Sequence, residues 1–206
     1  MADIELRPGY TIYFGNYPQD SSGETAPIAW RVLDVKEGRA LLLSRDILDV
    51  QPYAGDDGSV FWGNCFLRGW LENEFRPRAF SPEENALVFQ PEDPAYGDTD
   101  ELLWEQFGME DMTESVHDAV FVLSVDDILR YFPGENSLFC PGASARGTEW
   151  VEERTNGEGL CWWLRTSSAR YGYVQVVSPA DSIGACGMPG ETLHGVRPAF
   201  WLRTDR

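Results

Sequence analysis

The stretch GVRPAFWLR, residues 195–203, combines apolar and aromatic residues with two arginines. We predict that it forms one strand, whose side chains alternate between two faces. One face takes Val196, Phe200 and Leu202, and the other takes Arg197 and Trp201. Pro198 has no N–H group to donate to a neighbouring strand, so it marks a sheet edge or a bulge.

An earlier stretch, CWWLRT at residues 161–166, repeats this combination of tryptophan and arginine on a strand. A guanidinium beside an indole ring can stack on the ring while its N–H groups bond to carbonyl or carboxylate oxygens. We therefore assign structural roles to the main aromatic and arginine residues of both stretches. They are Trp162, Trp163, Arg165, Arg197 and Trp201.

The rest of the chain reads as short strands with a few helices. Residues 10–15 alternate as a strand does, and residues 27–35 and 39–44 form a hairpin around Gly38. Helical spacing covers residues 64–75, and Ser81 and Ser124 each begin a further helix with an acidic residue three positions later. Residues 119–124 form a buried strand, and residues 133–159 are mostly loop. Strands and helices do not alternate regularly, so we predict an α+β fold with a mostly antiparallel sheet.

Composition limits the classes of function. The chain of 206 residues fits one domain spanning residues 1–206, and its net charge of −18 argues against nucleic acid or an anionic membrane as partner. No apolar stretch approaches the roughly 20 residues of a membrane span, and no secretion signal is visible, so we expect a cytoplasmic protein. Ten acidic residues and no Lys or Arg lie between 92 and 118. That run is either a solvated loop or a site for a cation or a basic partner.

The cysteines and histidines do not suggest a metal site. Four widely spaced cysteines without a C-x-x-C pair, and only two histidines, disfavour structural zinc. In a cytosolic protein we expect the cysteines to be free and mostly buried thiols. We therefore predict no metal and no cofactor.

The order of several sequence blocks resembles a family of bacterial domains of unknown function, DUF6273, which is common in gut Firmicutes. The blocks are FGNYPQ, IAWRVLDV, ALLLSRDILD, LRGWLENEF, AFSPEE, VFVLSVDDILRYF, WWLR and GVRPAFWL. The resemblance covers residues 9–202. The final pair of blocks also resembles the core of C-type-lectin-like folds, which include formylglycine-generating-enzyme-like domains and the variable proteins of diversity-generating retroelements. That resemblance implies that the first and last strands pair, with residues 10–15 beside residues 195–202.

Two chemistries known for this fold find little support in the residues. A calcium-dependent lectin needs E-P-N or Q-P-D with W-N-D to supply oxygen ligands, and none of these is present. A formylglycine-generating oxidase needs two cysteines that cooperate with copper. Cys161, Cys186 and His194 lie in the corresponding region, so an enzyme with a pocket near these three residues is the alternative hypothesis.

The leading hypothesis is a non-catalytic module that binds a protein, peptide or glycan through residues 167–194. This segment is rich in Tyr, Ser and Gly, which supply rigid contact area and adaptable hydrogen bonds. The resemblance to retroelement-diversified proteins points to eight contacts here, and the position of His194 before the last strand adds a ninth. An ordinary exposed hairpin is the competing interpretation. The predicted ligand contacts are Ser168, Arg170, Tyr171, Tyr173, Gln175, Ser178, Asp181, Ser182 and His194.

Overall fold

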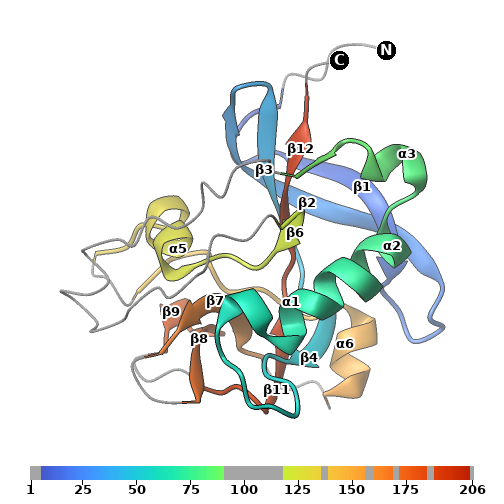
Figure 1. The fold of residues 1–206 in the computed structure, drawn as a ribbon. Helices are drawn as coiled ribbons and strands as arrows, with labels where there is room; N and C mark the ends of the chain where they lie inside the picture. Colours follow the sequence, from blue (N-terminus) through green and yellow to red (C-terminus); the bar gives the residue numbers. More distant parts are fainter. Residues whose placement is uncertain are drawn as a thin grey trace.

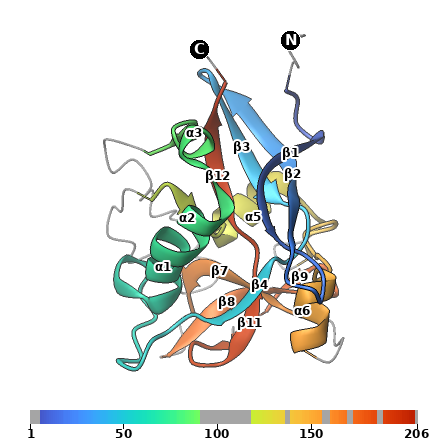
Figure 2. The ribbon, with the colours of Figure 1, turned by 90° about the vertical axis from the view of Figure 1, so that its right-hand side faces the viewer.

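The computed structural model describes residues 6–90, 118–135, 139–155, 160–168, 172–184 and 188–204. It is an α+β fold in which two strongly twisted sheets lie one above the other, as Figures 1 and 2 show. The predicted class and the mostly antiparallel pairing are confirmed. Within the described residues, only the pair of β7 and β11 among the named strands is parallel.

The first sheet follows the order β1-β2-β3-β12-β5, with β6 also paired to β12. The predicted hairpin is confirmed, and its turn places Glu37 and Gly38 at positive φ. Leu42 and Leu43 of this hairpin are fully buried, because both faces of the sheet are covered. The strands are β1 (Thr11–Pro18), β2 (Thr25–Lys36), β3 (Arg39–Ser44), β5 (Val88–Phe89), β6 (Val120–Phe121) and β12 (Ala199–Arg203).

The second sheet follows the order β10-β8-β7-β11-β4, with β9 paired to β8. Trp162 and Trp163 begin its central strand and are fully buried. The strands are β4 (Asp49–Pro52), β7 (Trp162–Ser167), β8 (Tyr173–Ser178), β9 (Ser182–Ile183), β10 (Met188–Pro189) and β11 (Leu193–Val196).

The stretch 195–203 is not one strand, as the sequence suggested, but the connection between the two sheets. Its first part belongs to β11 and its second part to β12, and the chain leaves one ladder for the other at Arg197 and Pro198. Pro198 lacks an N–H group, so a break costs no ladder hydrogen bond at this position. Arg197 holds the break in place by donating to the carbonyl oxygens of Ser44 (2.7 Å) and Ala143 (2.9 Å).

The expected pairing of the first and last strands is wrong for the described residues. β1 pairs with β2, whereas β12 pairs with β3, β5 and β6. The hairpin of β2 and β3 therefore lies between the first strand and the last. The reason is local: β1 leads into this hairpin along the chain, and Leu41, Leu42 and Leu43 of β3 take the positions beside β12.

A helical segment covers the predicted range 64–75 and continues beyond it. It consists of α1 (Phe66–Trp70), a π-helical turn η2 (Leu71–Phe75) and α2 (Arg76–Ala79), preceded by the short 3-10 turn η1 (Trp62–Asn64). The segment runs alongside both sheets in Figure 1 and contacts β1 and β4.

The two predicted helix starts are confirmed as capping boxes. Ser81 and Glu84 cap α3 (Pro82–Asn85), and Ser124 and Asp127 cap α5 (Val125–Tyr131). A further helix, α6 (Glu149–Arg154), lies within the region that we expected to be mostly loop. It follows Thr148, but position 151, three residues later, is Val and not an acidic residue. The capping-box pattern that identified the other two helices is therefore missing from the sequence.

One continuous hydrophobic core joins the two sheets and the helices. Trp30, Trp62, Trp162 and Trp163 are its largest fully buried side chains. The described cysteines are free thiols, of which Cys65 and Cys140 are buried. None of the helices in the described ranges has both the length and the apolar character needed to cross a membrane.

Candidate functional site

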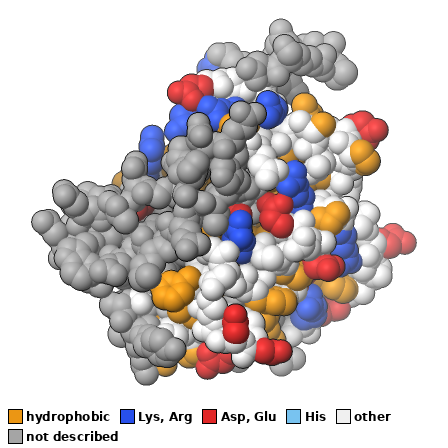
Figure 3. All heavy atoms as spheres, viewed as in Figure 1, with side chains coloured by type: hydrophobic (Ala, Val, Ile, Leu, Met, Phe, Trp, Pro, Cys, Tyr) orange, Lys and Arg blue, Asp and Glu red, His pale blue; other side chains and the backbone are white. Residues whose placement is uncertain are grey.

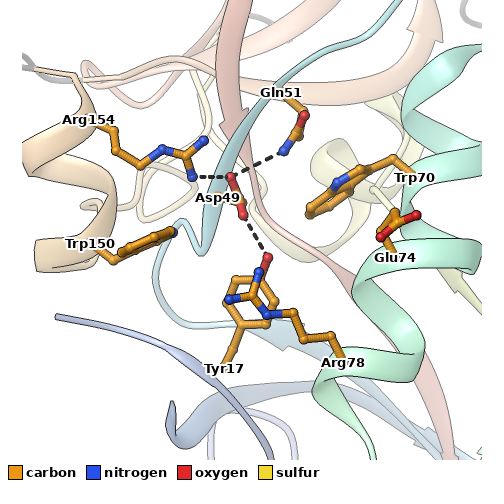
Figure 4. A pocket seen from close by; sticks show the side chains of 8 residues that line it. All are labelled: Tyr17, Asp49, Gln51, Trp70, Glu74, Arg78, Trp150 and Arg154. Atoms are coloured by element: carbon orange, nitrogen blue, oxygen red, sulfur yellow. Dashed lines mark hydrogen bonds and ion pairs between the residues drawn. The ribbon is translucent and has the colours of Figure 1, made fainter. Parts of the chain in front are cut away.

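A pocket of about 370 Å³ opens where four separate segments of the chain meet. Strand β1 contributes Tyr17, β4 contributes Asp49 and Gln51, and α6 contributes Trp150 and Arg154 (Figure 4). The helical segment contributes Trp70, Glu74 and Arg78. Ligand pockets of small molecules begin at about 300 Å³, so this volume suits one small ligand.

The three residues from the helical segment are spaced four positions apart. An α-helix has 3.6 residues per turn. The residues four and eight positions after Trp70 would therefore each lie further around the helix axis. The π-helical turn at Leu71–Phe75 has more residues per turn and reduces this drift. Trp70, Glu74 and Arg78 therefore reach the same pocket.

Asp49 lies at the base of the pocket and has its acceptor positions occupied. Its side chain is 5% exposed, and it accepts hydrogen bonds from the Tyr17 hydroxyl (2.6 Å) and Arg154 Nη1 (2.7 Å). The backbone N–H of Val50 (2.7 Å) and Nε2 of Gln51 (3.4 Å) also point to this carboxylate. Burial, and then the charge of Asp49, raise the pKa of the Tyr17 hydroxyl well above its usual value, so Tyr17 stays a donor.

The two arginines of the pocket each lie against an aromatic ring. The Arg154 guanidinium lies 5.2 Å from the ring centroid of Trp150, and that of Arg78 lies 5.0 Å from the ring centroid of Tyr17. Trp150 is held in turn by its backbone N–H, which donates to the Gln19 carbonyl at 3.2 Å. These contacts fix the side chains before any ligand arrives, which lowers the entropy cost of binding.

Glu74 and Arg78 differ from the other charged residues of the pocket in their pairing. Arg154 forms an ion pair with Asp49, whereas neither Glu74 nor Arg78 has an ion-pair partner within the described part of the chain. Two opposite charges that are four positions apart on one helix usually form such a pair. Here both side chains are instead available to a ligand (Figure 4).

None of the described contacts that we predicted in residues 168–182 lines this pocket. They lie on β8, at the start of β9 and in the turns next to β7 and β9. Gln175 is fully buried, and Tyr173 is half-buried at the start of β8. The Ser178 and Ser182 hydroxyls bond to each other at 2.7 Å. Ser168 donates its backbone N–H to the Tyr173 carbonyl at 2.9 Å.

Asp181 also has a local structural partner. It adopts a positive φ of 55°, and its carboxylate accepts the Ser144 N–H at 2.7 Å. The hydrogen bonds from backbone N–H groups outweigh its desolvation and lower the pKa of the carboxyl. Arg170 and Tyr171 lie outside the described residues. The role of this set in ligand binding stays a prediction.

His194 is the predicted contact that lies next to the pocket. It is directly opposite the pocket residue Gln51 in the antiparallel pair of β11 and β4. Residues directly opposite in such a pair share a face of the sheet. The imidazole packs edge-on against Trp163, at 4.8 Å between ring centroids, and burial lowers its pKa, so it is neutral at pH 7.

The alternative site around Cys161 and His194 lacks the electrostatics of an activated thiol. The two residues are close along the backbone, because the Gly195 N–H donates to the Cys161 carbonyl at 2.9 Å. Burial raises the pKa of the Cys161 thiol, whereas a nucleophilic cysteine needs a lowered one. Cys186 lies outside the described residues, and no group of His, Cys, Asp and Glu suited to a metal occurs among those described.

A second buried carboxylate, Asp118, ends the acidic run of the sequence. It accepts hydrogen bonds from Trp62 Nε1 (2.6 Å) and Arg68 Nε (2.7 Å) and thereby ties this part of the chain to the helical segment. Both of its carboxylate oxygens are engaged by these donors and the residue is buried, so we assign it a structural role. Residues 92–117 of the acidic run lie outside the described residues.

Fold and site together define the class of this protein as a two-sheet α+β domain that has a polar pocket with tryptophan walls. Residues 37–204 match the profile of a family described as a domain of unknown function, DUF6273, and the chain belongs to this family. All the pocket residues except Tyr17 lie within the matched range. No curated protein and no solved structure matches the chain.

Proposed function

We propose that this domain is a non-catalytic binding module that holds a small polar ligand in the pocket between Trp70 and Trp150. The observation that carries this proposal is the pair of indole rings on opposite sides of the braced carboxylate of Asp49 (Figure 4). Aromatic walls with a few well-placed polar groups are typical of small-molecule sites. The pocket replaces the C-terminal loops as the proposed main site, with His194 beside it.

The chemistry of the lining supports binding rather than catalysis. Asp49 is occupied by four donors, so it has little capacity to act as a base or nucleophile. The other lining residues include no Ser, Thr, Cys, His or Lys, which are the usual partners of a nucleophile and base pair. Glu74 alone is an unpaired acid, and one carboxylate does not make the pair of a glycosidase.

The described part of the face shown in Figure 3 favours a small ligand over a large apolar partner. On the face shown in Figure 3, charged side chains of both signs are interspersed with small groups of hydrophobic ones. Large exposed apolar patches mark many protein-docking sites. A peptide or protein partner would therefore bind through the pocket and its rim.

The finer expectations from the sequence remain part of this proposal. They are a C-type-lectin-like arrangement, an origin in gut Firmicutes and a location in the cytoplasm. The chain runs directly from β11 to β12, and each of these strands has a neighbour on both sides in its sheet, which supports a lectin-like core. The separation of β1 from β12 is the feature that departs from it.

The proposal is tested by a thermal-shift screen of saccharides, amino acids and short peptides, followed by calorimetry on each hit. A ligand at 100 times its Kd stabilises the native state by about 2.7 kcal/mol, which is visible as a raised melting temperature. We expect Trp70→Ala and Trp150→Ala each to weaken binding by at least tenfold. Phe66→Ala is the matched control, because Phe66 is a 41% exposed aromatic residue of the same helical segment outside the pocket.

Two outcomes would replace this proposal by an earlier hypothesis. Binding that survives both tryptophan substitutions but is lost in Tyr173→Ala would return the site to the C-terminal loops. Turnover of a hit that is lost in Cys161→Ser and His194→Ala would favour the enzyme hypothesis.

A further inference from the structure

Some charged groups of the pocket are already bonded to protein groups, and others are available to a ligand. Asp49 is occupied by Tyr17 and Arg154, and the Arg154 bond uses only one of its terminal nitrogens. The guanidinium of Arg78 rests on the Tyr17 ring without a carboxylate partner in the described residues. The groups that remain for a ligand are the Glu74 carboxylate, the Gln51 amide and N–H donors of Arg78 and Arg154. The indole N–H of Trp150 is also buried without a hydrogen-bond partner.

Arg78 is exposed at the pocket, and none of the ion pairs in the described part of the chain uses its guanidinium. The fork of five N–H donors matches a carboxylate in a bidentate arrangement. Stacking on Tyr17 holds Arg78 in one orientation, so little side-chain entropy is lost when an anion binds. This part of the pocket therefore suits a single carboxylate.

The remaining groups suit hydroxyls next to a ring with apolar faces. A hydroxyl both donates and accepts, so it can pair with the Glu74 carboxylate and with the donors of Gln51 and Arg154. Trp70 and Trp150 offer flat apolar surfaces on opposite sides of these groups (Figure 4). A purely apolar ligand would leave the polar groups buried and unpaired, which is costly.

We infer that the ligand of this pocket is a saccharide unit that carries a carboxylate, of the hexuronate type. The inference rests on the proposed binding function of the pocket and adds the chemical class of its ligand. The sugar ring lies between the indoles, its carboxylate bonds to Arg78, and its hydroxyls bond to Glu74 and Gln51.

Other ligand classes fit the same groups less well. A phosphate ester carries up to two charges and would be repelled by Glu74 and Asp49, which both line the pocket. A quaternary ammonium ion suits an aromatic cage, but two arginines line this one. An amino acid could bridge Glu74 and Arg78, yet it lacks a saturated ring that would contact both indoles.

The test is calorimetric titration of the full chain with glucuronate, galacturonate and short oligogalacturonates. Glucose and galactose serve as the neutral counterparts, and a panel of amino acids is titrated in parallel. We expect at least one uronate to bind tenfold or more tightly than its neutral counterpart. Its affinity should fall as the salt concentration rises, because one charged pair forms on binding.

Variants then assign the carboxylate contact. Arg78→Gln should weaken uronate binding by roughly 10- to 100-fold while changing binding of the neutral sugar less than threefold. Arg78→Lys keeps the charge but loses the fork of N–H donors. Its affinity for the uronate should lie between those of the wild type and Arg78→Gln. Arg130→Gln is the control, since Arg130 is a 64% exposed arginine outside the pocket. Circular dichroism of each variant verifies that the fold is kept.

The outcomes separate this inference from the proposed function. If uronates bind no better than neutral sugars, or if amino acids are the only ligands, the ligand class is wrong. The proposed function still stands in that case, provided that Trp70→Ala and Trp150→Ala abolish binding. If uronate binding survives both tryptophan substitutions, the inference and the proposed function are both wrong. Failure of every uronate to bind overturns the inference.

Discussion

At the scale of single residues, Tyr17 and Asp49 form the brace on which the pocket depends. The hydroxyl of Tyr17 donates to the buried carboxylate at 2.6 Å. Desolvation, and then the nearby charge, make ionisation of Tyr17 unfavourable in the folded protein. The hydrogen bond therefore exists only while the folded protein keeps the proton on Tyr17.

The pH dependence of stability should report on this brace. The pKa of Tyr17 is raised in the folded state, whereas an unfolded tyrosine titrates near pH 10. The stabilisation is complete below about pH 10 and is lost as the pH rises above it, because the unfolded state then releases a proton that the folded state retains. Urea unfolding from pH 8 to pH 11 should show a steeper loss for the wild type than for Tyr17→Phe. At pH 8 the variant should be less stable by about 1–3 kcal/mol.

The control for this series is Tyr10→Phe, since Tyr10 is 50% exposed. Its curve should follow that of the wild type throughout. Tyr131 also has a raised pKa, through burial and the charge of Asp34, so some loss above pH 10 remains in Tyr17→Phe. Equal slopes for the wild type and Tyr17→Phe would contradict the brace.

At the scale of elements, the bulge in β1 shows how closely the helical segment approaches the first sheet. Gly15 lies at this irregularity with φ of 66°, and its N–H donates to the Glu84 carboxylate at 3.0 Å. A Cβ atom on Gly15 would lie 2.7 Å from both the Ala79 carbonyl oxygen and the Phe80 ring. Only glycine satisfies the backbone angle and the close approach together.

We expect Gly15→Ala to lower the free energy of unfolding by roughly 3 kcal/mol, from backbone strain and overpacking combined. Gly9→Ala is the matched control, because Gly9 also has a positive φ but has open space where its Cβ would lie. That variant should cost only about 1 kcal/mol. Equal losses in urea denaturation would show that the contact with α2 does not matter.

Local elements could be predicted from the sequence, whereas their assembly could not. Capping residues and periodicity identified the hairpin and two capped helices, because those signals depend on neighbours in the chain. The break at Pro198 depends on which strands meet there, and no local pattern encodes that. The site was missed for the same reason: Trp70, Glu74 and Arg78 recur at four-residue spacing, as do Trp150 and Arg154, but nothing in either stretch shows that they face each other.

At the scale of the whole molecule, Arg197 ties the two sheets into one structure. Its guanidinium bonds to carbonyls of Ser44, Arg45 and Ala143 and lies 5.1 Å from the ring centroid of Trp162. Burial lowers its pKa to about 9, which is above neutral pH, so the group stays charged. Together with the continuous core, this contact supports a single domain that unfolds cooperatively.

We expect Arg197→Met to lower the free energy of unfolding by about 3 kcal/mol or more, because it leaves buried carbonyls with fewer donors. Unfolding followed by circular dichroism and by tryptophan fluorescence should still give one coincident transition. Arg203→Met, at the exposed end of β12, should change stability by less than about 1 kcal/mol. Two separate transitions would show that each sheet is an independent unit.

The run from β11 to β12 also bears on how the chain is made. A ribosome releases β3 and β4 early, but their partners β12 and β11 are synthesised much later: Arg197 and Ser44, which bond to each other, are 153 residues apart. The growing polypeptide must therefore keep two open strand edges from aggregating until β11 and β12 emerge. Protection of the nascent chain by a chaperone, rather than stepwise folding during translation, is the route that this topology favours.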